Sequence, residues 1–81
     1  MRVRVKLFAA ARQQVGQDVV QVELPESATI ADLREQLAGQ FPALQSGASH
    51  LLFAVNHQYA TDDVSLAADA EIAGFPPVSG G

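Results

Sequence analysis

The sequence predicts an α+β domain in which one main helix packs across a mixed β-sheet. Two segments near the N-terminus alternate polar and apolar residues, as half-buried strands do. A single stripe of apolar residues at helical spacing follows, and two further strand-like segments come after it. The order β-β-α-β-β contains no repeat and no linker, so the 81 residues are expected to form one domain around one core.

Residues 2–8 and 18–24 are the expected first two strands. Each places valine and leucine on one face and mainly polar side chains on the other. Residues 9–15 between them are expected to form a short helical turn, which Gly16 ends because glycine readily adopts the left-handed conformation. Because the connection is short, the two strands are expected to pair in antiparallel fashion.

The main helix is expected to begin after Thr29 and to stop at Pro42. Thr29 is a favourable N-cap, and Asp32 in the first turn suits the positive end of the helix dipole. The apolar stripe expected to pack on the sheet consists of Ile30, Leu33, Leu37 and Phe41. The side chains expected to face water are those of Arg34, Glu35, Gln36 and Gln40.

The second half of the chain supplies the remaining strands. After a loop over residues 42–49, the apolar run at residues 50–55 is typical of a central strand. A turn and a short edge segment over residues 59–66 follow, and residues 71–75 form the last strand. This order suggests the ubiquitin-like β-grasp architecture, in which the first and last strands run parallel at the sheet centre.

Composition and charge exclude several classes of function. The chain has no cysteine, which removes disulfides, thiolate metal sites and cysteine nucleophiles. No apolar run approaches the ~20 residues of a membrane span, and we expect a cytoplasmic protein. From Glu35 onward the chain has acids but no lysine or arginine. This argues against nucleic acid as a partner and for a basic docking surface, with a solvated acidic face as the alternative.

No arrangement of residues typical of an enzyme is present. The glycines before the C-terminus are scattered singly, so there is no glycine-rich phosphate loop. His50 and His57 lack a pattern of further ligands, so no metal site is expected. Asp62 and Asp63 are adjacent, and adjacent side chains on an extended segment point to opposite faces, so they do not suit an acid–base pair. By itself the chain is expected to catalyse nothing and to bind no cofactor.

Residues 76–81 are expected to form a flexible tail on a domain of residues 1–75. Prolines cannot donate to a sheet ladder, so the last strand should end before the two prolines. The Ser-Gly-Gly end has little side chain to order it, and extended it could reach roughly 20 Å into a narrow channel. The α-carboxylate of Gly81 is the reactive group at its tip. For Gly-Gly alone, a frayed terminus is the ordinary interpretation.

The two ends of the chain carry motifs that together point to one family. The C-terminal segment is Phe75-Pro76-Pro77-Val78-Ser79-Gly80-Gly81, and residues 7–16 read Leu-Phe-Ala-Ala-Ala-Arg-Gln-Gln-Val-Gly. They resemble the C-terminus and the aromatic-Ala-x-x-Arg-Glu-x-x-Gly segment of the MoaD-type, ubiquitin-like sulfur carriers, which are the small subunits of molybdopterin synthase. The resemblance extends over nearly the whole chain and also implies the β-grasp fold.

The resemblance implies that the chain is the non-catalytic, sulfur-donating subunit of a heteromeric sulfurtransferase. An activating enzyme (MoeB type) would use ATP to adenylate Gly81, and a sulfur donor enzyme would then replace AMP to leave a thiocarboxylate. The large synthase subunit (MoaE type) would accept the tail. Sulfur would pass to cyclic pyranopterin monophosphate and build the dithiolene that holds molybdenum. ATP would belong to the activating enzyme and not to this chain.

The resemblance also assigns roles to individual positions. Gly81 would bear the sulfur, and Gly80 would leave room beside it. The rest of the inserted segment would be Pro76, Pro77, Val78 and Ser79. The partner interface would include Phe75, Arg12 and Tyr59. Ordinary strand packing for Phe75 and a lone surface charge for Arg12 are the open alternatives.

Some positions depart from the family pattern. Gly74 stands where the family has a second aromatic residue, which would reduce the apolar docking patch. Gln13 replaces a glutamate, and Asp69 lies in a turn where a positive φ favours glycine. The alternatives to a molybdopterin synthase subunit are a β-grasp sulfur carrier for thiamine or tRNA thiolation and a non-covalent ubiquitin-like interaction module.

Overall fold

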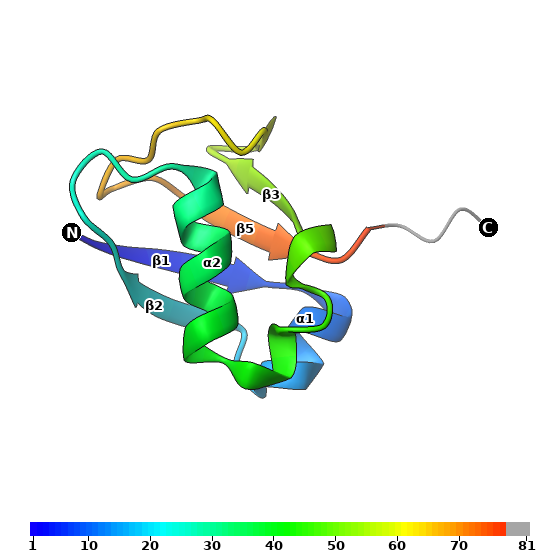
Figure 1. The fold of residues 1–81 in the computed structure, drawn as a ribbon. Helices are drawn as coiled ribbons and strands as arrows, with labels where there is room; N and C mark the ends of the chain where they lie inside the picture. Colours follow the sequence, from blue (N-terminus) through cyan, green and yellow to red (C-terminus); the bar gives the residue numbers. More distant parts are fainter. Residues whose placement is uncertain (78–81) are drawn as a thin grey trace.

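The computed structural model describes residues 1–77, in which α2 crosses one face of a five-stranded mixed sheet (Figure 1). Residues 78–81, including most of the predicted tail, lie outside the described residues. The elements in chain order are β1 (Arg2–Leu7), α1 (Ala9–Val15), β2 (Val19–Glu23), α2 (Ile30–Gln40), the 3-10 turns η1 (Pro42–Leu44) and η2 (Ala48–His50), β3 (Leu52–Val55), β4 (Gln58–Ala60) and β5 (Ile72–Phe75). No helix in residues 1–77 has the length and apolarity needed to cross a membrane.

The strand order β2-β1-β5-β3-β4 places the last strand of the chain at the centre of the sheet. β1 pairs antiparallel with β2 and parallel with β5, as predicted. β5 pairs antiparallel with β3 on its other side, and β3 pairs antiparallel with β4. This topology confirms the predicted fold class, an α+β β-grasp with one main helix across a mixed sheet.

The core lies between the sheet and α2. The predicted alternation of β1 is confirmed, because Val3, Val5 and Leu7 are buried while the residues between them are exposed. α2 is held in place by its own apolar stripe and by a capping box at its start: Thr29 N–H donates to Asp32 Oδ2 at 2.9 Å, and Asp32 N–H donates to the Thr29 hydroxyl oxygen. Each fully buried aliphatic side chain contributes about 1.5–3 kcal/mol to folding.

Several local predictions are wrong at their boundaries. Residues 42–49 are not an irregular loop but contain η1 and the start of η2. Because η2 continues to His50, β3 begins only at Leu52. It is an interior strand, as predicted, with β5 on one side and β4 on the other. The edge segment is a strand only as far as Ala60. Asp69 does not take a positive φ, whereas Asn56 and His57 do, with φ of 51° and 71° in the β3–β4 turn.

Arg34 was predicted to face water, and this prediction is wrong. Its guanidinium lies 5.1 Å from the centroid of the Phe53 ring, and one nitrogen donates to the carbonyl oxygens of Ala48 and Leu51 at 2.7 and 2.6 Å. Another nitrogen donates to Asp62 Oδ1 at 2.8 Å. The side chain is only 20% exposed. Arg34 therefore joins α2 to η2, to the start of β3 and to the loop after β4.

Gly74 faces the core and not the docking surface. It lies opposite Phe53 in the β5–β3 pair, and a Cβ at this position would be 3.2 Å from Cε1 of that ring and 3.4 Å from Leu7 Cδ2. Its neighbours Ala73 and Phe75 point to the opposite face because side chains alternate along a strand. Gly74 was expected to reduce the apolar docking patch. Because it faces the core, the lack of a side chain here affects core packing and not the outer face of the sheet.

We expect Gly74→Val to lower the free energy of unfolding by about 1–3 kcal/mol, because the branched side chain overpacks the space held by Phe53. Gly39→Ala is the matched control. A Cβ at Gly39 meets no atom within 4 Å, so alanine should raise the free energy of unfolding by roughly 0.5 kcal/mol. Urea unfolding of the two variants measures both changes, and a native-like stability of Gly74→Val would contradict the tight packing.

Arg34→Lys should lower the free energy of unfolding by about 1–3 kcal/mol, because a single ammonium cannot replace the three hydrogen bonds of the guanidinium fork. Asp62→Asn should cost less, since the carboxylate is 58% exposed and keeps only a surface ion pair. Glu35→Gln, on the next and exposed position of α2, serves as the control in urea unfolding. A larger loss for Asp62→Asn than for Arg34→Lys would show that the ion pair dominates.

Candidate docking face at the root of the C-terminal tail

The tail leaves the domain from an interior strand that is held on both sides. Leu52 of β3 lies opposite Phe75, the last residue of β5. On the other side, the backbone N–H of Phe8 donates to the carbonyl oxygen of Gly74 at 3.1 Å. β5 ends at Phe75, directly before Pro76, as predicted. The root of the tail therefore has a defined position between β1 and β3.

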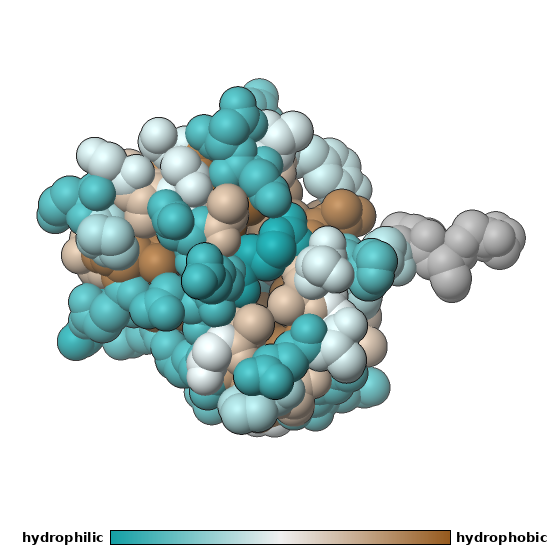
Figure 2. Space-filling model, in the orientation of Figure 1, coloured by the Kyte–Doolittle hydropathy of each residue, from teal (hydrophilic) through white to brown (hydrophobic). Residues whose placement is uncertain are grey.

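Four large apolar side chains lie around this root, on β3, β4 and β5 and directly after β1, and we call them the apolar patch: Phe8, Leu52, Tyr59 and Phe75. Tyr59 is 77% exposed, Phe8 41% and Leu52 37%. The rings of Tyr59 and Phe75 meet edge to face with centroids 5.7 Å apart. By contrast, the surface over α2 on the helix side is mostly hydrophilic (Figure 2). Clustered exposed apolar side chains are typical of binding surfaces.

The structure brings together two of the three predicted interface residues. Tyr59 and Phe75 are both in the apolar patch, whereas Arg12 is on α1, which packs beside β5, and its side chain is exposed. Phe8 and Leu52 also belong to the patch, although neither was predicted as an interface residue. Strand alternation contained the signal, since Phe8 continues the outward series of β1 and Leu52 precedes the buried Phe53.

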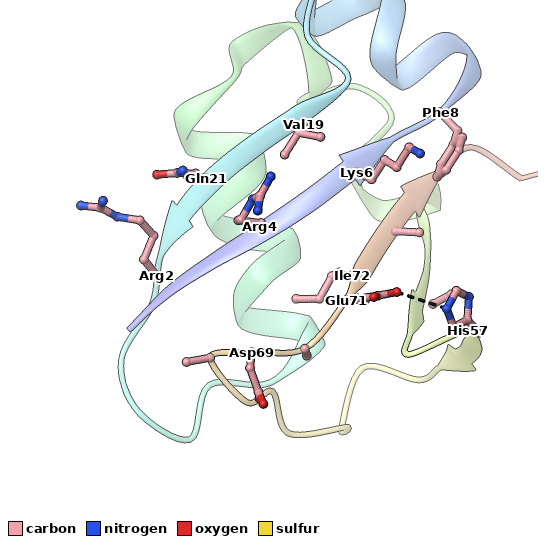
Figure 3. A pocket seen from close by; sticks show the side chains of 14 residues that line it. Arg2, Arg4, Lys6, Phe8, Val19, Gln21, His57, Asp69, Glu71 and Ile72 are labelled. Carbon is pink, nitrogen blue, oxygen red and sulfur yellow. Dashed lines mark ion pairs between the residues drawn. The ribbon is translucent and has the colours of Figure 1, made fainter.

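The open face of the sheet, opposite α2, has a hollow of about 670 Å³ that extends away from the patch (Figure 3). Phe8 and Lys6 line it at the patch end, and Asp69 lines it near the far end of β5. His57 Nε2 lies 3.1 Å from Glu71 Oε2 beside it, and both of these side chains are largely exposed. The hollow is open to solvent, and it does not enclose the tail root.

The two adjacent carboxylates of the sequence each have a local partner. Asp62 is bound by Arg34, and Asp63 accepts a hydrogen bond from the Thr61 hydroxyl, which holds the pKa of Asp63 below its usual value. The two carboxylates therefore do not form an acid–base pair. No group of three or more histidine, aspartate or glutamate side chains in this part of the chain has the geometry of a metal site.

Comparison with known proteins relates the site to a family. The sequence matches the ThiS family over residues 5–81. The molybdopterin synthase sulfur carrier subunit of Arabidopsis thaliana is 32% identical over 100% of this chain and 84% of its own length. The protein of that name from Escherichia coli (strain K12) is 37% identical over 98% of this chain and 99% of its own.

A solved structure agrees with the fold. The crystal structure of small archaeal modifier protein 1 from Haloferax volcanii superposes with a TM-score of 0.86 at 35% identity and covers 100% of both chains. Both the residues that build the tail root and the residues that follow it fall inside the family match. The chain belongs to the ThiS family, and its predicted kinship with the ubiquitin-like sulfur carrier subunits of molybdopterin synthase is confirmed.

Proposed function

We propose that this chain is the sulfur carrier subunit of a molybdopterin synthase and that Gly81 is its sulfur-bearing residue. The observation that carries the proposal is the full-length match to curated sulfur carrier subunits, which includes the Phe-Pro-Pro-Val-Ser-Gly-Gly segment predicted to be the working end. The absence of cysteine adds support, since a carrier without a thiol has to hold sulfur elsewhere.

The chemistry of the terminal carboxylate defines what its partners have to do. A carboxylate is a poor acyl donor until one of its oxygens becomes a good leaving group. An activating enzyme joins a Gly81 carboxylate oxygen to the α-phosphate of ATP and releases pyrophosphate. A sulfur donor enzyme then supplies sulfur at the sulfide level, which bonds to the Gly81 carbonyl carbon, displaces AMP and leaves a thiocarboxylate. The synthase transfers this sulfur to cyclic pyranopterin monophosphate, and two transfers form the dithiolene.

In this proposal the chain positions the sulfur and contributes no catalytic group. β5, paired on both sides, directs Pro76 and Pro77 away from the domain, and the residues after them extend into the large synthase subunit. The apolar patch around the root binds that subunit, with Tyr59 as its most exposed ring. We further propose that Arg12, which is exposed on the neighbouring helix α1, contacts a carboxylate of the same partner.

Protein modification is the second candidate function. The observation that favours it is the similarity to small archaeal modifier protein 1, which is as close in identity as that to the sulfur carrier subunits. The two functions share an activated C-terminus and differ in the acceptor: a pterin in one case and a protein in the other. Carriers for thiamine or tRNA thiolation remain further alternatives. Rescue of molybdenum cofactor synthesis in a strain without its own carrier distinguishes them.

Incubation with ATP, the activating enzyme and a sulfur donor should replace one oxygen of Gly81 by sulfur. Mass spectrometry of the intact chain and of its C-terminal peptide measures the exchange. A variant with one extra residue after Gly81 should remain unloaded, because its carboxylate is displaced from the activating site. Sulfur on any internal residue, or loading of the extended variant, would contradict the proposal.

Tyr59→Ala should weaken binding to the large synthase subunit by about 2 kcal/mol, because exposed aromatic anchors dominate interface energies. Its melting temperature should stay near the native value, since the side chain is 77% exposed. Gln58→Ala is the matched control, because this neighbour on β4 is exposed and points to the other face. Titration calorimetry measures the affinities, and equal binding by Tyr59→Ala and the native chain would remove the patch from the interface.

A further inference from the structure

The open face of the sheet carries a row of cations that the proposed function does not use. Arg2, Arg4 and Lys6 alternate with the buried residues of β1, so all three side chains emerge on the face opposite α2 (Figure 3). They are three of the five basic residues of the chain. From the acids in the second half of the sequence, we predicted that the surface of the partner is basic. Folding instead places this basic strand beside β5, next to the tail root.

Two of the three cations have no carboxylate partner within residues 1–77. Arg2 is paired, with its Nε 2.7 Å from Glu23 Oε1. Arg4 lies opposite the neutral Gln21 on β2, and no ion pair within the described part of the chain includes Arg4 or Lys6. Two acids also line the hollow: Glu71, just before β5, has its Oε2 3.1 Å from His57 Nε2, and Asp69 has no ion pair with Arg4 or Lys6. The local pairing therefore leaves two adjacent positive charges.

The surroundings of Lys6 connect this row to the apolar patch. Its ammonium lies 5.4 Å from the centroid of the Phe8 ring. In the cross-strand register, Lys6 lies opposite Ala73, which lies opposite Ala54, which lies opposite Tyr59. The two alanines have short side chains and line the 670 Å³ hollow, and in this register they lie between Lys6 and Tyr59. One continuous surface thus holds an apolar edge, two short alanine side chains and a basic edge.

We propose that this hollow receives an extended acidic segment of the large synthase subunit, with carboxylates against Arg4 and Lys6. The inference rests on the proposed function and names the chemistry of its interface. Side chains two residues apart on a strand are about 7 Å apart, a spacing that alternate residues of a second extended segment match. Continuity with the apolar patch and charge complementarity select this occupant. Such charge pairs mainly raise the association rate and specificity.

The first test measures binding of the large synthase subunit by surface plasmon resonance at low and high salt. Arg4→Gln/Lys6→Gln should raise the dissociation constant about tenfold at low salt, chiefly through a slower association rate. The difference should shrink near 0.5 M salt, because screening shortens the range of the interaction. Gln45→Glu/Ser46→Glu is the control: it makes the same change in net charge at exposed positions after α2, and it should bind like the native chain.

The second test uses Lys6, the only lysine in the chain, as a chemical probe. A water-soluble carbodiimide joins an amine to a carboxylate as an amide, with water lost to the reagent. In the complex, Lys6 should couple to an aspartate or glutamate of the large subunit, and mass spectrometry of the digest identifies the segment. Lys6→Arg keeps the charge but should give no such cross-link, whereas its affinity should remain native.

The outcomes separate this inference from the proposed function. Native-like binding by Arg4→Gln/Lys6→Gln, together with weakened binding by Tyr59→Ala, would overturn the acidic segment and leave the docking patch intact. An equal loss in the Gln45→Glu/Ser46→Glu control would also overturn it, since the effect would then be overall charge. The double substitution Arg4→Gln/Lys6→Gln could instead weaken binding of a duplex oligonucleotide while leaving the affinity for the large subunit unchanged. That result would assign the face to a phosphate polymer and overturn the inference. Failure of the native chain to bind the large subunit would overturn both.

Discussion

The parallel pairing of β1 with β5 is the interaction on which the rest of the structure depends. Parallel strands need a crossover connection, and here nearly the whole chain between them serves as that connection. The pairing joins the two ends of the sequence at the sheet centre. As a result Phe8, from the N-terminal motif, lies beside Gly74 and Phe75, from the C-terminal motif. Two segments far apart in the sequence, the end of β1 and the end of β5, therefore lie side by side in the fold.

The two faces of the sheet have different roles because side chains alternate along each strand. The inner face of β1 and β5 packs under α2, and Gly74 belongs to it because Phe53 already fills the space beside it. The outer face has no covering layer within the described chain. It therefore presents the apolar patch, the two alanines and the basic row of β1 to solvent. The proposed docking surface therefore needs no element beyond the sheet itself.

Several polar side chains fasten the connection that runs between β1 and β5. Arg34 binds carbonyl oxygens at η2 and before β3, where the backbone has no strand partner for them. The amides of Gln36 and Gln40 donate to the carbonyl oxygens of Glu23 and Gln21 on the edge strand β2. The two glutamines satisfy carbonyl groups of the edge strand, and Arg34 adds a second donor to the Ala48 carbonyl oxygen, which already accepts from Leu51 N–H. These contacts also leave β4, with Tyr59, as the less protected edge beside the patch.

The sequence by itself determined the features that depend on neighbours along the chain. The period of two in β1, the Thr29 cap, the helical stripe of α2 and the strand end before Pro76 were all predicted and are confirmed. Each follows from backbone preference or from the spacing of apolar residues within a few positions. The resemblance of the terminal segments likewise predicted the family, because those motifs are read directly from consecutive residues.

Only the tertiary structure decided which distant residues meet. Arg34 was predicted to face water, but it is mostly buried because its partners lie at residues 48, 51 and 62, and no local pattern contains them. Phe8 and Leu52 join Phe75 only because β1 and β3 both pair with β5. The basic row of β1 comes beside the tail root for the same reason. Which strands pair depends on the packing of residues that are distant in the sequence. The distribution of charge and apolar residues along the chain therefore does not predict which side chains become neighbours.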